Sequence, residues 1–500
     1  MTTAPARQHF NVTLAVLALA ALSYALLQTM VAPALPEIQH ELGATPTQVT
    51  WVLTVYLLSA SIATPILGRL GDMFGKEHML VVVLGLFAVG SLISALSSSL
   101  ELLIAGRAVQ GAAGAVFPLA FGIIRDEFPR DRVATGIGLI SATFGIGGGA
   151  GLILSGLIVD HLSYRWIFWF GLVVVLIATV ATHLWVPESP VKSPARVDLG
   201  GAVLLSAGLT AFLLAVSEGN RWGWGSARII GLFVAAAVLL VICVRYEQRV
   251  AEPLVDIDLL RLRGVWTTNL TGFLIGFGMF GSFILVPQFV QMPDASGYGF
   301  GVGVTGAGLF MLPSTAIMLV AGPLAGTLAG RVGSKVPLLI GTACASVSFV
   351  LLAAAHSDAW QIVLAVGILG LGIGLSFASM ANLIVDAVPQ SQTGEATGMN
   401  TIMRTVGGAF GAQIAAAIIT NHLEPGTDFP AEGGFTAAFV LGAVSVAVAF
   451  AAATLIPGRA SSGGRKGGRI VGSPRHLPRR AHGPSGSEDQ GRRSPLPPAR

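Results

Sequence analysis

The segment 68–77, GRLGDMFGKE, places four charged side chains and three glycines between two long apolar runs. Asp72 at this position can accept hydrogen bonds from a helix N-terminus or from an arginine. The glycines allow a tight turn and a close approach to another helix. A phosphate-binding loop is excluded, because no strand precedes the segment and no βαβ unit surrounds it. The alternatives are a solvated basic turn and a moving part, whose residues would be Gly68, Arg69, Asp72, Gly75 and Lys76.

Two arginines, Arg107 and Arg404, lie inside apolar runs, where a charge is costly unless it faces a cavity or a partner. Gln110 follows Arg107 by three residues, so both side chains lie on one face of a helix. We expect Arg107 and Gln110 to handle substrate or protons, the alternative being a structural hydrogen-bond hub. Arg404 is a weaker candidate, because a side chain so near the start of its run can extend to the membrane interface. Gln28 in the first run is a further candidate for substrate handling.

Carboxylates are absent from the middle of every apolar run, and Asp126, Asp160 and Asp386 stand at the edges. If transport is coupled to protons, the proton is therefore carried by a carboxylate at the edge of a run or by the substrate itself. The third alternative is that proton coupling is weak. Uncharged polar side chains are more frequent in the runs, where they can line a cavity or join helices. These candidates are Gln28, Tyr56, Asn269, Gln288, Asn382, Asn400 and Gln413.

The composition indicates whether the apolar runs lie in water or in lipid. Hydrophobic residues make up 53% of the 500 residues and charged residues 11%, against about 25% charged in soluble domains. Such a chain cannot cover a water-exposed surface, so we expect it to lie in a lipid bilayer. Ten of the 29 basic residues fall in residues 457–500, whose composition predicts a disordered tail. The basic character is thus not a nucleic-acid-binding face, and the two cysteines define no metal site or disulfide framework.

Apolar runs of about 20 residues are long enough to cross a bilayer as helices. Thirteen Lys and Arg residues fall in the connections on the side of the N-terminus and three in the others, which places both termini in the cytoplasm. The sequence contains fourteen runs: 12–34, 48–68, 78–97, 101–124, 135–158, 165–186, 200–217, 228–245, 265–290, 303–322, 336–355, 360–383, 397–420 and 434–456.

An internal repeat relates the second and tenth, fourth and twelfth, and fifth and thirteenth runs. PILGRLGDMFG at 65–75 matches PLAGTLAGRVG at 323–333 with an offset of 258, and two further pairs match at 260. We expect two six-helix halves of the same orientation with the substrate site between them. The predicted parts are residues 1–186 and 265–456 as the halves, 187–264 with two inserted helices, and 457–500 as the tail.

These patterns resemble the major facilitator superfamily, and within it the fourteen-helix drug:proton antiporter branch, over roughly residues 12–456. GRLGDMFGK is similar to the family's loop 2–3 signature, and LIAGRAVQGAAGA at 103–115 to its fourth-span signature. The resemblance implies that the loop 2–3 segment is a latch that holds the outward-facing state. In the second half Gly330 stands where Asp72 stands in the first, so a charged latch would be one-sided.

The sequence departs from the branch at three places. Leu27 stands where the first span usually carries an acid, and Gly171 stands where asparagine is common in the sixth. The fifth-span antiporter signature lacks its proline and one glycine, which are Leu152 and Ser155 here. Its remaining glycines are expected to pack against a neighbouring helix: Gly147, Gly151 and Gly156.

We therefore expect an all-α integral membrane protein that is not an enzyme and needs no cofactor or metal. The resemblance implies a secondary transporter in the plasma membrane that exports small organic molecules by alternating access, in exchange for protons. The alternatives are a transporter of an anionic metabolite without proton antiport, and a polytopic receptor or channel. We expect a monomer whose partners are its substrate, protons and lipid, with no nucleic acid.

Overall fold

The computed structural model describes residues 10–192, 198–250, 252–424 and 429–457. Regular structure in these residues is helical, and one isolated bridge joins Leu423 to Pro430. Fourteen helices of the described part are long and apolar enough to cross a membrane, which confirms the predicted number. Beyond Pro457, the predicted tail lies outside the described residues.

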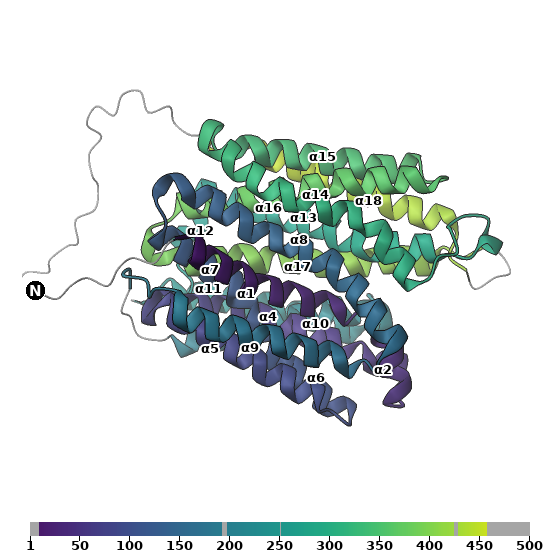
Figure 1. Ribbon diagram of the computed structural model, residues 1–500, viewed down its shortest axis with the longest axis horizontal. Helices are drawn as coiled ribbons and strands as arrows, with labels where there is room; N and C mark the ends of the chain where they lie inside the picture. The colour runs from purple at the N-terminus through teal and green to yellow at the C-terminus, as the bar shows by residue number, and fades with distance from the viewer. Residues whose placement is uncertain (1–9, 193–197, 251, 425–428, 458–500) are drawn as a thin grey trace, which may run out of the picture. The chain divides into compact units, whose positions relative to one another are not determined.

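The spans follow one another along the chain (Figure 1). The first six are α1 (Phe10–Met30), α4 (Trp51–Phe74), α5 (Lys76–Ala95), the pair α6 (Leu100–Gln110) and α7 (Val116–Glu127), α8 (Arg130–His161) and α9 (Arg165–Trp185). The inserted spans are α10 (Leu199–Trp222) and α11 (Ala227–Glu247). The last six are α13 (Arg263–Gln291), α14 (Val304–Val332), α15 (Lys335–Ala354), α16 (Ala359–Ala387), α17 (Thr393–Asn421) and α18 (Glu432–Thr454).

Short helices complete the chain outside the spans. They are α2 (Leu35–Glu41), α3 (Pro46–Val49), α12 (Ile257–Arg261), η1 (Gly111–Ala115) within the fourth span, η2 (Asp294–Ser296) and η3 (Gln390–Gln392). The 3₁₀ turn η1 lies where the chain passes α4 closely, since a Cβ on Gly111 would stand 1.7 Å from the Ser59 hydroxyl.

Several helices extend beyond the apolar runs that predicted them. Helix α4 continues to Phe74 instead of ending near residue 68, and α14 continues to Val332 instead of 322. Within GRLGDMFGKE the turn is therefore Gly75 alone, with φ of +121°, a backbone conformation that glycine adopts without strain. Helix α4 can carry charged residues in its last turns because those residues contact other helices instead of lipid.

Several helix pairs join the halves of the fold, and two of them have the most extensive contact. Helix α4 packs against α17, and α14 packs against α8. The inserted helix α10 contacts both α4 and α17 and pairs with α11. An apolar cluster holds it there, formed by Leu205, Leu209 and Leu213 of α10, Leu58 and Ile66 of α4, and Met399, Ile402 and Val406 of α17.

Candidate functional site

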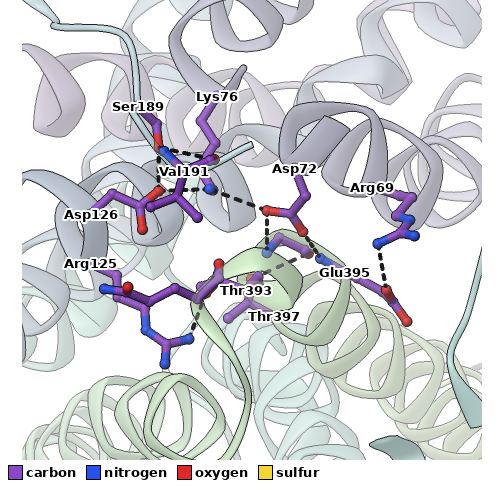
Figure 2. A network of polar contacts seen from close by, with 12 residues as sticks. Arg69, Asp72, Lys76, Arg125, Asp126, Ser189, Val191, Thr393, Glu395 and Thr397 are labelled. Atoms are coloured by element: carbon purple, nitrogen blue, oxygen red, sulfur yellow. Dashed lines mark hydrogen bonds and ion pairs between the residues drawn. The ribbon is translucent and has the colours of Figure 1, made fainter. Parts of the chain in front are cut away.

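Asp72 lies in the last turns of α4 and points at the first turn of α17 (Figure 2). Its carboxylate accepts hydrogen bonds from the backbone N–H groups of Gly394, at 3.3 Å, and Glu395, at 3.1 Å. The first-turn N–H groups of a helix have no partner within it and carry partial positive charge. The buried Asp72 carboxylate thus caps a helix that belongs to the other half of the chain.

Lys76, at the start of α5, neutralises Asp72 and a second carboxylate. Its Nζ lies 3.4 Å from Asp72 Oδ1 and 2.7 Å from Asp126 Oδ2, and all three side chains are fully buried. Ser189, after α9, donates to the same oxygen of Asp126 at 2.5 Å. The aliphatic stem of Lys76 lies over Gly122 of α7, where a Cβ would stand 2.6 Å from its Cδ. One ammonium group therefore joins α4, α5 and α7.

Arg69 and Glu395 form an ion pair between α4 and α17. Their closest atoms are 3.5 Å apart, and the Glu395 side chain is 4% exposed. Glu395 Oε1 also accepts a hydrogen bond of 2.6 Å from the backbone N–H of Asp256, in the segment that follows the inserted helices. We call Arg69, Asp72, Lys76, Asp126 and Glu395 the Asp72 cluster. Its members come from both halves of the chain.

Arg125 reinforces the same junction from the end of α7. It donates to the hydroxyl of Thr393 and to the carbonyl of Val388, both at 2.6 Å. Sequence reasoning missed Arg125 and Glu395 as site residues. The signal available was weak: Glu395 stands in the polar stretch SQTGEATG, which reads as an ordinary approach to an apolar run.

The glycines of the motif make the contact close enough for these bonds. A Cβ on Gly68 would stand 2.7 Å from the carbonyl oxygen of Gly394, and one on Gly394 would stand 2.5 Å from that of Gly68. Gly75 turns beneath the Glu188 carboxylate, whose nearer oxygen would be 2.3 Å from a Cβ. Backbones that touch in this way bring Asp72 within reach of the N-terminus of α17.

The repeat-related contact between α14 and α8 is uncharged in its interior. Gly322 and Gly138 face each other, and a Cβ on either would stand 2.3 Å from the carbonyl oxygen of the other. The contact continues along both helices to the far end, where Thr305 donates to Asp160 at 3.2 Å. Gly330, the counterpart of Asp72, has open space around it.

A cavity of about 220 Å³ lies between the halves, toward the ends of α4 and α17 opposite to the Asp72 cluster. Its polar groups are uncharged, and no acidic or basic side chain lines it among the described residues. The lining residues are Gln28, Thr29, Ala32, Leu53, Tyr56, Leu57, Phe144, Gly145, Gly148, Gly149, Leu152, Phe280, Phe283, Ile284, Met311, Ser314, Thr315, Met318 and Ala412. An apolar wall with a few convergent polar groups is typical of a small-molecule site.

Gln28 and Tyr56 are the two members of the predicted polar set that line this cavity. The Oε1 atom of Gln28 has no hydrogen-bond partner in the described part of the chain. Asn269 and Asn400 instead bond to each other at 3.0 Å, and Gln413 accepts from Asn220 of α10. These amides join helices, which is their usual role in membrane bundles.

Arg107 lies behind the cavity wall. Its guanidinium carbon is 3.9 Å from the centre of the Tyr56 ring, and the side chain is fully buried. Arg107 donates to the carbonyl of Val52 at 3.2 Å and to Gln110 Oε1 at 2.8 Å, and Gln110 donates to Ser91. Its Nη2 has no hydrogen-bond partner within the described residues. Arg107 and Gln110 thus support a wall residue and do not line the cavity themselves.

Arg404 of α17 also stands behind an aromatic wall residue. Its guanidinium carbon lies 4.2 Å from the ring centre of Phe377 and 5.8 Å from that of Phe144, which lines the cavity. The residue is 8% exposed, so it does not extend to the membrane interface. Neither Arg107 nor Arg404 has an ion-pair partner among the described residues.

Two of the departures from the family pattern meet in space. The Leu27 side chain is fully buried, and its methyl carbons would stand 2.4 Å from a Cβ on Gly171. The absence of a side chain at Gly171 leaves the space that the Leu27 side chain occupies. At this point of the first span a leucine side chain packs against a glycine, and Leu27 supplies no titratable group.

The span-5 glycines contact two different helices. Gly147 and Gly151 pack on α1, where Thr29 donates to the Gly147 carbonyl at 2.9 Å. Gly156 lies against Thr305 of α14. Ser155, which replaces a glycine of the signature, donates to the carbonyl of Met30 at 2.5 Å.

A polytopic bundle with a cavity between its halves and an ion-pair cluster across one end belongs to the class of membrane transporters. The profile of the Major Facilitator Superfamily matches residues 17–412. The chain belongs to this superfamily.

Several curated proteins are similar to the chain. An uncharacterized MFS-type transporter of Mycobacterium tuberculosis is 33% identical. The match covers 79% of this chain and 58% of that protein. The chain thus spans less than two thirds of that relative. The multidrug transporter protein MdtP of Bacillus subtilis is 29% identical over 83% of this chain and 78% of its own length. The tetracenomycin C resistance and export protein of Streptomyces glaucescens is 28% identical over 84% of this chain and 77% of its own length.

A solved structure shares the fold. The match to the human organic anion transporter MFSD10 covers 89% of this chain and 99% of that chain, with a TM-score of 0.63 and 15% sequence identity. The predicted all-helical fold of this superfamily is therefore confirmed.

Proposed function

We propose that the protein exports small organic molecules across the plasma membrane by alternating access. The observation that carries this proposal is the arrangement of the cavity and the Asp72 cluster. The cavity lies between the halves, and the cluster closes the same interface at the other end of α4 and α17. Opening the cluster would give a cavity ligand a path to that side. Relatives named as multidrug and tetracenomycin C exporters support a small organic substrate.

The cluster end would face the cytoplasm. The excess of Lys and Arg in the connections at this end supports that orientation. The conformation described above would then be closed to the cytoplasm, and both termini would be cytoplasmic. The contacts at both ends of the cavity come from one chain, which is consistent with a monomer as the transporting unit.

Proton exchange would use carboxylates outside the cavity, since none lines it among the described residues. Asp72, Asp126 and Glu395 are buried at the interface that must open, and opening would expose them to water. A carboxylate that changes from buried to hydrated changes its affinity for protons. The gate and the proton carrier would then be the same set of side chains.

One observation favours a second candidate, the export of an anionic molecule without proton antiport. Arg107 and Arg404 are buried behind Tyr56 and Phe144 and have no acidic partner among the described residues. An anionic substrate group that reached either guanidinium would supply the missing counter-charge.

Flux assays in proteoliposomes separate the two candidates. Efflux of a cationic dye and of an anionic dye is measured with an imposed pH gradient and again after a protonophore collapses it. Proton antiport predicts that transport stops with the gradient, and the anion candidate predicts that anionic dye flux persists. Arg404→Gln should then reduce only anionic dye flux, while Arg261→Gln, which alters an arginine side chain that is 65% exposed, should have no effect. Absence of flux for both dyes and for a broader set of small organic compounds would contradict the exporter proposal.

A further inference from the structure

Two carboxylates of the inserted helix pair face each other at the end of the bundle that carries the Asp72 cluster. Asp198 immediately precedes α10, and Glu247 is the last residue of α11. Glu247 Oε1 and Asp198 Oδ2 lie 2.2 and 2.5 Å from the point that a Cβ on Gly201 would occupy. Glu247 is 2% exposed and Asp198 is 9% exposed. Gly201 is therefore the residue that leaves room for the two carboxylates to meet.

The oxygens that face each other lack partners. Asp198 Oδ1 caps α10 by accepting from the Gly201 N–H at 2.9 Å, and it also accepts from the Tyr246 hydroxyl at 3.2 Å. Asp198 Oδ2 and both carboxylate oxygens of Glu247 have no hydrogen bond of ordinary geometry among the described residues. The backbone N–H groups of Leu254 and Val255 also approach the Glu247 carboxylate, outside ordinary hydrogen-bond geometry.

The charged and titratable surroundings do not neutralise the pair. Arg69 of α4 is the cation that faces Glu247, and it forms its ion pair with Glu395 instead. Cys243 of α11 lies beside both carboxylates, with its Sγ 4.0 Å from the Gly201 carbonyl. Two buried carboxylate oxygens, both acceptors only, are therefore in close proximity. One proton would convert them into a donor and an acceptor and would remove one of two buried charges.

We propose that Asp198 and Glu247 bind one proton between them, and that this proton site is coupled to the Asp72 cluster through residues 254–256. The proton comes from water, joins one carboxylate oxygen and is shared with the other by a hydrogen bond. It returns to water when the pair separates, and no electrons are transferred.

Residues 254–256 connect the two sites physically. Leu254 and Val255 are buried against Glu247, and the next residue, Asp256, donates its N–H to Glu395 at 2.6 Å. The Asp256 carboxylate also accepts from Gln392, just before α17. Loss of the proton leaves two buried anions, which favours hydration of the pair and displacement of this segment. Displacement removes the Asp256 N–H from Glu395, so release of the proton and opening of the cluster favour each other.

Infrared spectroscopy of the full chain in liposomes tests the proton site directly. The carboxylic C=O band of the shared proton is the component that the unmodified protein should show near neutral pH and that both Glu247→Gln and Asp198→Asn should lose, separate from any band of the Asp72 cluster. Loss of the same band in both single variants indicates a shared proton. If the two acids bound protons independently, each substitution would remove one band and leave the band of the other acid. Asp258→Asn, which alters a side chain that is 88% exposed, should retain the band. A band that survives either of the first two substitutions would overturn the shared site.

Coupling is tested by the distance between two spin labels across the cluster. Phe74→Cys and Gln390→Cys place labels at exposed positions beside α4 and α17, with Cys344 replaced by serine and the buried Cys243 left in place. The distance should lengthen as pH rises, and Glu247→Gln should hold the short distance at every pH. The same pH response with and without Glu247→Gln would overturn the coupling.

The coupling rests on the proposed function, whereas proton binding does not. A protein that shows the shared band and the pH-dependent distance but transports nothing would contradict only the exporter proposal. A protein that transports with an unaltered band in the Glu247→Gln and Asp198→Asn variants would contradict only the proton site.

Discussion

The α4–α17 and α14–α8 contacts occupy equivalent places in the two halves, yet they are built differently. The first joins the halves through buried charges near one end of the helices, centred on Asp72. The second joins them through backbone-to-backbone packing at Gly138 and Gly322 and continues to the opposite end. Both interfaces contain a close backbone contact, at Gly68 and Gly394 in the first and at Gly138 and Gly322 in the second, but only the first adds buried charges that water can solvate.

This difference indicates which contact opens. Charged groups that separate regain hydration, so part of the energy of their contact is recovered. Interlocked backbones that separate leave voids or require lipid to enter, and they recover little. We therefore expect α14–α8 to remain packed while α4–α17 opens and closes. Four substitutions test that asymmetry.

Gly322→Val should have the largest effect. Its side chain would replace the close contact with the Gly138 carbonyl, and neither backbone can yield without moving a whole helix. We expect a loss of about 3 kcal/mol in the free energy of unfolding, as for severe overpacking. Thermal unfolding in detergent measures it. Gly231→Val, at a position in α11 with open space, is the matched control and should leave the transition unchanged.

Asp72→Asn should impair transport and spare the fold. The amide nitrogen of asparagine cannot accept from Gly394 or Glu395, and the charge opposite Lys76 is lost. A hydrogen bond to a charged group contributes about 1.5–3 kcal/mol, so we expect transport to fall about tenfold. Flux in proteoliposomes measures it, and Asp131→Asn, at an exposed ion pair, serves as control. Unchanged transport would mean that the cluster is a static junction.

Arg69→Gln should have a smaller effect on transport. The Arg69–Glu395 pair is longer, at 3.5 Å, and Arg69 is partly accessible to water. Glu395 keeps its hydrogen bond from the Asp256 N–H when Arg69 is removed, so we expect a loss below the about 1.5–3 kcal/mol of a hydrogen bond to a charged group, which is about two- to fivefold in flux. Flux is compared with the Asp72→Asn variant under the same conditions. A loss greater than that of Asp72→Asn would place the main gate at Glu395.

Gly330→Ala should have the smallest effect. A Cβ there meets no atom within 4 Å, and the helix continues through the position. We expect a change within about 0.5 kcal/mol in unfolding and unaltered flux. Damage equal to that of Asp72→Asn would show that both repeats of the motif act as turns, and the proposed asymmetry would be wrong.

The sequence predicted the fourteen spans because each must offer an apolar surface to lipid, and hydropathy records that requirement. It also singled out Asp72, since a charged segment between apolar runs is conspicuous. It could not identify the partners of Asp72, because Gly394 and Glu395 are more than 300 residues away and reach it only through the packing of the halves.

The sequence also could not predict where helices end or that Leu27 and Gly171 are in contact. Helix α4 continues past its apolar run because its polar end packs against protein. Leu27 and Gly171 each departed from the expected pattern, and the structure places them in contact. The positions of Arg107 and Arg404 behind aromatic wall residues depend on side-chain orientations that no periodicity records.

Helix α10 has a consequence for how a lipid-soluble molecule reaches the cavity. Its apolar face covers the seam between α4 and α17, and its Ser217 and Asn220 bond to Thr54 and Gln413 on the two sides of that seam. A molecule that diffuses in the bilayer along this side meets α10 before it meets the seam. Lateral access from the membrane is therefore obstructed there, and α10 must tilt or slide whenever α4 and α17 separate.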